Sequence, residues 1–152
     1  MEKIFETNPS KIAKNFIDKL KSEKDFDEEY PYYGCLCEYE NIVAEFGETI
    51  IYKIHENYSG DMWFLLNING KFAYLNLSYG SCSGCDALQG CNSLKDLNDL
   101  IIEIYNSMVK FDSSAEALEF FESESRECDA AWYYDENKQF VSEAIEYFKN
   151  LA

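Results

Sequence analysis

The sequence predicts an α+β fold in which a small antiparallel β-meander of about three strands is flanked by N-terminal and C-terminal helices. The central observation is a pair of aromatic and aliphatic runs, 61–68 and 71–77, joined by Asn69-Gly70. An Asn-Gly pair between such runs is typical of a type I′ hairpin turn. Apolar residues also recur at helical spacing before and after this region. With 152 residues, 47% of them apolar, the chain is expected to form one acidic domain over residues 1–152.

Two helices are predicted ahead of the strands. Asn8 and Pro9 form a favoured helix start, because Asn caps the first turn and Pro tolerates the first helical position. This helix is expected to run to about Lys24. Apolar residues at helical spacing over residues 38–46 predict a second helix. Gly47 follows directly and is predicted to end that helix in the left-handed conformation.

Three consecutive antiparallel strands are predicted next. Residues 49–55 alternate as in a strand with one buried face, formed by Ile50, Tyr52 and Ile54. The hairpin over residues 61–77 supplies the other two strands and is expected to be the centre of the sheet.

The C-terminal half is predicted to be helical. Residues 93–96 and 113–116 resemble capping boxes, each opening a helix with an apolar stripe. Lys110 is expected at the end of the first of these helices, where the helix dipole favours a cation. Asp135 is predicted to cap a last helix, which buries an apolar stripe of its own.

The charge balance excludes several classes of partner. Lys and Arg number 13 against 29 Asp and Glu, which gives a net charge of −16. Such a body repels phosphates, so direct nucleic-acid binding and adhesion to an anionic membrane are not expected. Residues 111–152 alone hold eleven acids against three bases. Two interpretations remain for this region: a solubilising face, or a surface that imitates a phosphate backbone for a basic protein partner. The candidate partner-binding residues are Glu116, Glu119, Glu122, Glu127, Asp129, Trp132 and Tyr133.

The sequence predicts a cytoplasmic location in a reducing environment. The N-terminal residues lack the apolar stretch of a secretory signal peptide, and no apolar run is long enough to span a bilayer. The six cysteines are therefore interpreted as thiols or metal ligands and not as disulfides.

The most unusual stretch is Tyr79–Cys91, with three glycines, two serines and three cysteines. A zinc site is one interpretation, with Cys82 and Cys85 as one ligand pair and Cys35 and Cys37 as the other, but the C-x-C spacing of the second pair is irregular for structural zinc. A redox interpretation fits less well, because the motif follows a hairpin and does not open a helix. The preferred interpretation is a structured loop of small thiols and turn glycines, with no cofactor.

No catalytic residue is predicted. The single histidine, His55, ends a predicted strand and is interpreted as an edge residue. A loop cysteine acting as a nucleophile would need His55 as its base, and nothing in the sequence places it nearby. Carboxylate pairs such as Glu38 with Glu40 and Asp96 with Asp99 are interpreted as solvated faces.

The string YGSCSGCDAL, residues 79–88, resembles a family of small proteins of bacteria and their phages in which a strand ends in this motif and an acidic helical half follows. Phe111-Asp112-Ser113 is also similar, whereas the first 48 residues are not covered. The family brings no established activity, so the resemblance implies a phage or mobile-element setting and no catalytic residue.

Together these features predict a non-enzymatic acidic interaction protein in the bacterial host cytosol. The leading hypothesis is a phage-encoded inhibitor of a host defence nuclease, of the anti-CRISPR kind, which occupies a basic nucleic-acid-binding groove as a nucleic-acid mimic. The alternative hypothesis is a cytosolic cysteine-loop module that binds zinc or acts through its thiols.

Overall fold

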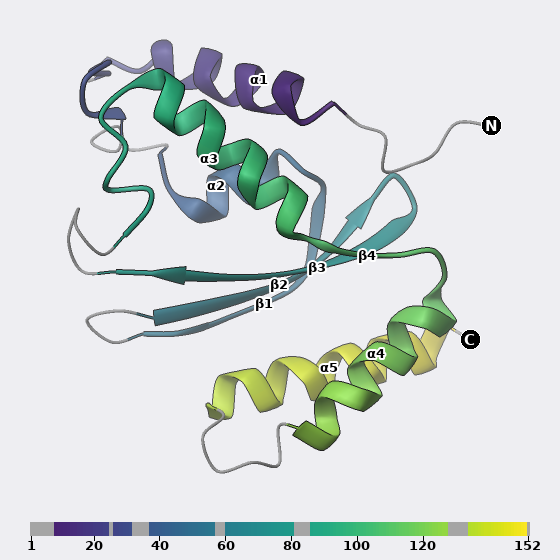
Figure 1. The fold of residues 1–152 in the computed structure, drawn as a ribbon. Coiled ribbons are helices and arrows are strands. Elements are labelled where there is room, and N and C mark those ends of the chain that lie inside the picture. Colours follow the sequence, from purple (N-terminus) through teal and green to yellow (C-terminus); the bar gives the residue numbers. More distant parts are fainter. Residues whose placement is uncertain are drawn as a thin grey trace.

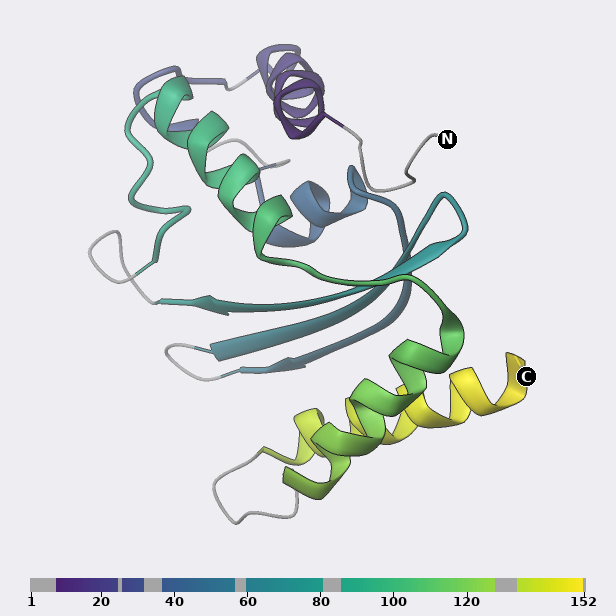
Figure 2. The ribbon, with the colours of Figure 1, turned by 45° about the vertical axis from the view of Figure 1, so that its right-hand side comes forward.

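The protein has an α+β fold in which a four-stranded antiparallel sheet lies between two layers of helices (Figures 1 and 2). The computed structural model describes residues 8–24, 26–31, 37–56, 60–80, 86–127 and 134–151. Helices α2 and α3 lie over one face of the sheet with α1 packed on α3 further out, and α4 and α5 cover the other face (Figures 1 and 2). The elements are α1 Pro9–Lys21, α2 Tyr39–Ala44, β1 Glu48–His55, β2 Gly60–Ile68, β3 Lys71–Tyr79, α3 Leu94–Ser107, β4 Val109–Phe111, α4 Ser114–Glu127 and α5 Asp135–Leu151.

The β2–β3 hairpin is the centre of the sheet, as predicted, because the strand order is β1-β2-β3-β4. Asn69 and Gly70 both have positive φ, 52° and 90°, which is the backbone that a type I′ turn requires. The Gly70 N–H donates to Asn67 Oδ1 at 2.8 Å and fastens the turn. Residues 62–66 of β2 are all buried, since β2 is covered by helices on both faces. This continuous burial is typical of a strand inside a layered fold.

The predicted face of β1 is wrong at Ile50. A β-bulge between Thr49 and Ile51 leaves Ile50 without a partner in β2. Because one extra residue shifts the alternation, Ile50 packs with Ile51 on the α5 side, whereas Tyr52 and Ile54 pack on the α3 side.

A fourth strand, β4, was not predicted. It pairs with β3 through Phe72, Ala73 and Tyr74, and with three residues it is too short to show alternation in the sequence. The expectation that Lys110 ends a helix is therefore wrong. Lys110 lies in β4, and its Nζ sits 4.7 Å from the centre of the Tyr105 ring.

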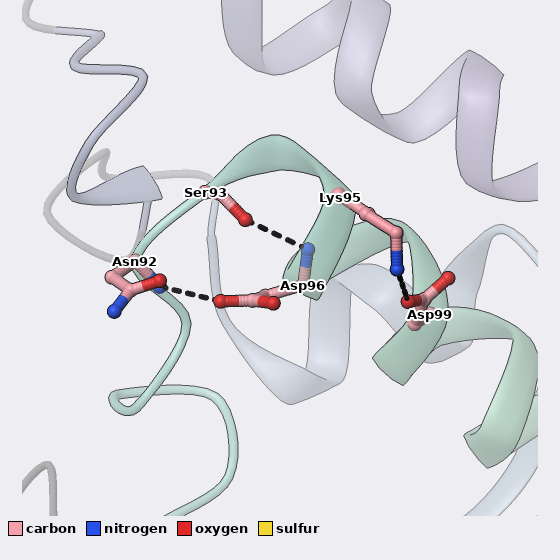
Figure 3. Close-up of polar contacts among 5 residues, drawn as sticks. All are labelled: Asn92, Ser93, Lys95, Asp96 and Asp99. Carbon is pink, nitrogen blue, oxygen red and sulfur yellow. Dashed lines mark hydrogen bonds and ion pairs between the residues drawn. The ribbon is translucent and has the colours of Figure 1, made fainter.

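Two of the predicted caps are present in α1 and α3. Asn8 Oδ1 accepts from the N–H of Ser10 at 2.9 Å at the start of α1. In α3, Ser93 Oγ accepts from the N–H of Asp96 at 3.1 Å (Figure 3). The Asp96 carboxylate reaches back to the N–H of Asn92, one residue before the cap, at 3.3 Å (Figure 3). This differs from a standard capping box, in which the reciprocal bond goes to the cap residue itself.

The helix α4 begins with the same arrangement. Ser113 Oγ accepts from the N–H of Glu116, and the Glu116 carboxylate accepts from the N–H of Asp112, both at 3.1 Å. Asp135 was expected to cap the last helix but is instead the first residue of α5. The carbonyl of Tyr134, which precedes it, accepts the first bond of that helix from Lys138.

Two further helix ends differ from prediction. The first helix ends at Lys21 and not at Lys24, because the hydroxyl and the N–H of Ser22 both bond to the Lys19 carbonyl and close the last turn. Gly47 does not adopt positive φ, and α2 ends in right-handed backbone at Glu45. A Cβ at Gly47 would lie 2.5 Å from the carbonyl oxygen of Asn67, so glycine is needed there for close approach to β2.

Each helical layer has its own core. The α3-side cluster joins α1, α2 and α3 to one face of the sheet, and its buried members include Phe16, Leu20, Ile42, Val43, Met62, Phe64, Leu66, Leu75, Leu97, Ile101 and Tyr105. The α5-side cluster joins α4 and α5 to the other face and consists of Trp63, Leu65, Phe111, Ala117, Phe121, Phe140, Val141, Ala144 and Phe148. In the described part of the chain, no helix is long and apolar enough to cross a membrane.

Candidate functional site

The outward face of α4 carries part of the predicted acidic surface. Glu116, Glu119 and Glu122 are exposed, while Ala117 and Phe121 on the opposite side of the helix are buried against α5 and the sheet. Among the described residues, Glu119 and Glu122 make no ion pair or hydrogen bond through their side chains. The three carboxylates therefore lie on one solvent-facing side of α4. Glu116 is bonded to the N–H of Asp112, whereas Glu119 and Glu122 have no partner within the part of the chain that the structure describes.

The remaining predicted partner-binding residues lie partly or wholly outside the described residues. Glu127 is the last residue of α4, but its side chain is not described. Asp129, Trp132 and Tyr133 lie outside the described residues. Tyr134, the next residue along, is 43% exposed and stacks on His55 with the ring centres 3.8 Å apart.

The carboxylates of α5 differ from those of α4, since two of them are paired with β1. Glu136 Oε2 lies 2.9 Å from His55 Nδ1, and Glu143 Oε2 lies 2.8 Å from Lys53 Nζ. The Glu136 N–H holds the pKa of the Glu136 carboxyl below its usual range, and His55 lowers that pKa further. These pairs fasten α5 to β1. His55 is the last residue of β1, an outer strand of the sheet, so it is an edge residue as predicted.

A pocket of about 410 Å³ opens on the α3 side of the sheet, at the end where β1 and β3 finish. Ile54, Met62 and Tyr79 form part of its lining on three neighbouring strands. Tyr79 pairs with Gly60 in the sheet, and a Cβ at Gly60 would lie 2.6 Å from the Tyr79 ring. Glycine at this position therefore lets the ring lie against β2. Sequence analysis did not identify this pocket, because its lining residues come from segments far apart in the chain.

One wall of the pocket depends on Asp86, a carboxylate that is only 5% exposed. Asp86 Oδ1 accepts from the Tyr39 hydroxyl at 2.8 Å and from the N–H groups of Leu88 and Gln89 at 2.9 and 3.2 Å. Asp86 Oδ2 accepts from the N–H of Gly80 at 3.0 Å. A buried carboxylate is stable only when donors surround it, and here four donors satisfy both oxygens. Asp86 thus joins the end of β3 to α2 and to the segment that leads into α3.

Asp86 was part of the singled-out stretch Tyr79–Cys91, but its role was missed. The sequence signal for this role is an Asp in a turn-rich segment, because Asp often accepts a hydrogen bond from the backbone N–H two residues later. Asp86 does so with the N–H of Leu88. Burial of Tyr39 raises the pKa of its hydroxyl, and the hydrogen bond to Asp86 raises that pKa further. The phenol therefore stays protonated and remains a donor.

Three further carboxylates line the pocket, from Glu38, Glu40 and Glu56. Glu38 and Glu56 are exposed, whereas Glu40 is half-buried and accepts from the Tyr52 hydroxyl at 3.3 Å. Burial raises the pKa of Tyr52, and the negative charges of Glu40 and Glu56 raise it further. The interpretation of Glu40 as part of a solvated face is therefore wrong. No Lys, Arg or His is among the described residues that line the pocket.

The two described cysteines are buried thiols. Cys37 and Cys91 belong to the α3-side cluster. Burial raises the pKa of Cys37 from 9.0 to about 12, and burial likewise raises the pKa of Cys91 to about 11. Such thiols are poor nucleophiles at neutral pH, because the thiolate is the reactive form.

Three of the four predicted zinc ligands, Cys35, Cys82 and Cys85, lie outside the described residues, so the structure does not test the zinc interpretation. Among the residues that the structure does describe, no group of three or more His, Cys, Asp and Glu side chains is arranged to hold a metal ion. His55 lies on the α5 side of the sheet with Tyr134, while Cys37 and Cys91 lie on the α3 side.

A scan of protein-family models, a search of curated proteins and a search of solved structures find no match to this chain.

Proposed function

We propose that this protein is a non-enzymatic inhibitor that occupies the basic nucleic-acid groove of a bacterial defence nuclease, in the manner of an anti-CRISPR protein. The observation that carries the proposal is the outward face of α4, where Glu116, Glu119 and Glu122 are exposed on a helix packed firmly from behind. A row of exposed carboxylates on a well-packed helix is a feature that a phosphate-binding groove attracts.

The placement of these carboxylates supports the proposal. Successive members of the row are three residues apart on one helix, so the row holds three negative charges within about 9 Å along the helix axis. A basic groove that binds phosphates attracts such a group of charges. The eleven acids against three bases in residues 111–152 add a broad negative field around this row.

The first step of the test identifies the partner and its salt dependence. Affinity capture from bacterial lysate at low and high salt is followed by purification of the captured nuclease and measurement of association rates. Association should slow steeply with salt, because the Debye length falls from about 10 Å at 0.1 M to about 3 Å at 1 M. Binding should also displace the nucleic acid of the nuclease.

The second step locates the surface. The variant Glu119→Lys/Glu122→Lys should associate about tenfold more slowly than the parent, since charge reversal acts mainly on the association rate. Glu48→Lys/Glu103→Lys is the matched control: both residues are exposed, and neither lies on α4. If both variants slow association equally, only net charge matters and the α4 surface is not the binding site. An unchanged rate for the α4 variant contradicts the proposal outright.

A further inference from the structure

The pocket at the end of the sheet combines an apolar interior with an acidic rim. Met62 and Leu88 are each 1% exposed and lie behind the lining, while the half-buried Ile54 and Tyr79 present apolar surface to the pocket. Glu38 and Glu56 are exposed and, among the described residues, have no side-chain partner. An apolar interior under a charged rim matches a long side chain with an aliphatic stem and a charged head.

The charge on the rim selects a cation. Asp86 is fully occupied by its four donors, so it shapes the wall and is not free to receive a ligand. Glu40 Oε1 accepts from Tyr52, which leaves the other oxygen of Glu40 for a ligand in the pocket that Glu38 and Glu56 also line. None of the described lining residues is basic, so the negative charge of these carboxylates favours a positively charged ligand.

The aromatic rings distinguish between cations. Tyr39 and Tyr79 both line the pocket, and the half-buried ring of Tyr79 is the more accessible of the two because Tyr39 is 8% exposed. A guanidinium group stacks on aromatic faces and binds a carboxylate through two parallel hydrogen bonds, whereas an ammonium group acts as a more strongly hydrated point charge. A volume of about 410 Å³ lies in the range of sites that enclose a small ligand or a protruding side chain.

We propose that this pocket is a docking site for an arginine side chain presented by a protein partner, with Glu38, Glu40 and Glu56 receiving the guanidinium group. The site lies on the α3 side of the sheet, and α4 covers the other side. It therefore does not depend on the α4 surface, and the experiment below needs neither the nuclease nor its groove.

The test titrates the protein with a short acetylated and amidated Gly-Arg-Gly peptide and follows backbone amide resonances by NMR. The amides of Tyr39, Gly80 and Gln89 should shift, and the peptide should bind about tenfold more tightly than the same peptide with citrulline, a neutral isostere of arginine. No shift at these amides, or equal binding of the citrulline peptide, overturns the proposal.

Matched variants separate the pocket from net charge. Glu38→Gln/Glu56→Gln should weaken binding about fivefold or more, whereas Glu48→Gln/Glu103→Gln, which removes the same charge elsewhere, should change it by less than about twofold. Equal weakening by both variants would mean general attraction and would overturn the site. Spermidine binding more tightly than the arginine peptide would assign the pocket to a free polyamine and would also overturn it. All four residues are exposed, and unchanged melting temperatures confirm that the variants fold.

Discussion

The α3-side cluster is largely aliphatic and contains two thiols, with the buried Asp86 network beside it, whereas the α5-side cluster is built from aromatic rings. Phe121 is central to the second cluster, since its ring contacts those of Tyr74, Phe140 and Phe148. One face of the sheet is therefore held mainly by packed aromatic rings, with Leu65, Val141 and two alanines between them. The other face combines packing with buried polar groups, and it is this face that forms a pocket.

The largest effect should come from the aromatic side. Phe121→Ala removes a fully buried ring and should lower the free energy of unfolding by about 3–5 kcal/mol, measured by urea denaturation. Phe120→Ala, a half-buried neighbour in the same helix, should cost clearly less. Equal losses for the two variants would mean that the cluster does not depend on its central ring.

The polar side should be sensitive to a change of one atom. Asp86→Asn can place an NH₂ group where Oδ2 now accepts from Gly80, so that two donors face each other in a buried position. We expect a loss of about 3 kcal/mol in the free energy of unfolding, because a buried donor is left without an acceptor. Asp99→Asn, which affects only an exposed ion pair with Lys95, should be nearly neutral. A neutral Asp86→Asn would show that the network does not stabilise this face.

The hairpin belongs to both faces and provides a test of their coupling. Gly70→Val should lower the free energy of unfolding by about 1–3 kcal/mol, because a β-branched residue is strained at positive φ. A Cβ at Gly70 would meet nothing within 4 Å, so backbone strain is the only cause. Gly70→Asn should cost less, since Asn tolerates this region. Hydrogen exchange should increase in α3 and α5 alike, and an increase on one side alone would contradict the shared role of the hairpin.

The smallest predicted effect concerns the buried thiols of the α3-side cluster. Their pKa values are raised in the folded protein, so the unfolded chain loses these protons at lower pH and stability falls as the pH rises past about 9. Each thiol should contribute a loss of about 0.7 kcal/mol between pH 8.5 and 9.5. Cys37→Ala/Cys91→Ala should flatten this dependence when unfolding is measured across that range. The same slope in parent and variant would mean that other groups cause it.

Much of the fold could be predicted because its signals are local. The Asn69-Gly70 turn and the caps at Asn8 and Ser93 each depend on a few adjacent residues. The bulge at Ile50 and the need for glycine at position 47 depend instead on the neighbouring strand β2, which no local pattern contains. β4 is defined only by its pairing with β3.

The site was less predictable than the fold. The exposed carboxylates of α4 follow from helical spacing on the side opposite Ala117 and Phe121. The pocket requires α2, the ends of β1 and β3 and the residues near Asp86 to meet in space, and the sequence separates Tyr39 from Asp86 by 47 positions. Only the tertiary contacts show that these carboxylates share one opening.

The burial of β2 from both sides has a consequence for the growing chain. Trp63 and Leu65 point to the face that α4 and α5 cover, and those helices lie in the roughly 40 residues that follow β4. At a synthesis rate of about 5–20 residues per second, α4 and α5 are complete roughly 2–8 s after β4 has been made, and until then these side chains are not covered. During that interval the apolar side chains on this face of the sheet are exposed to solvent, and we expect the nascent protein to bind ribosome-associated chaperones.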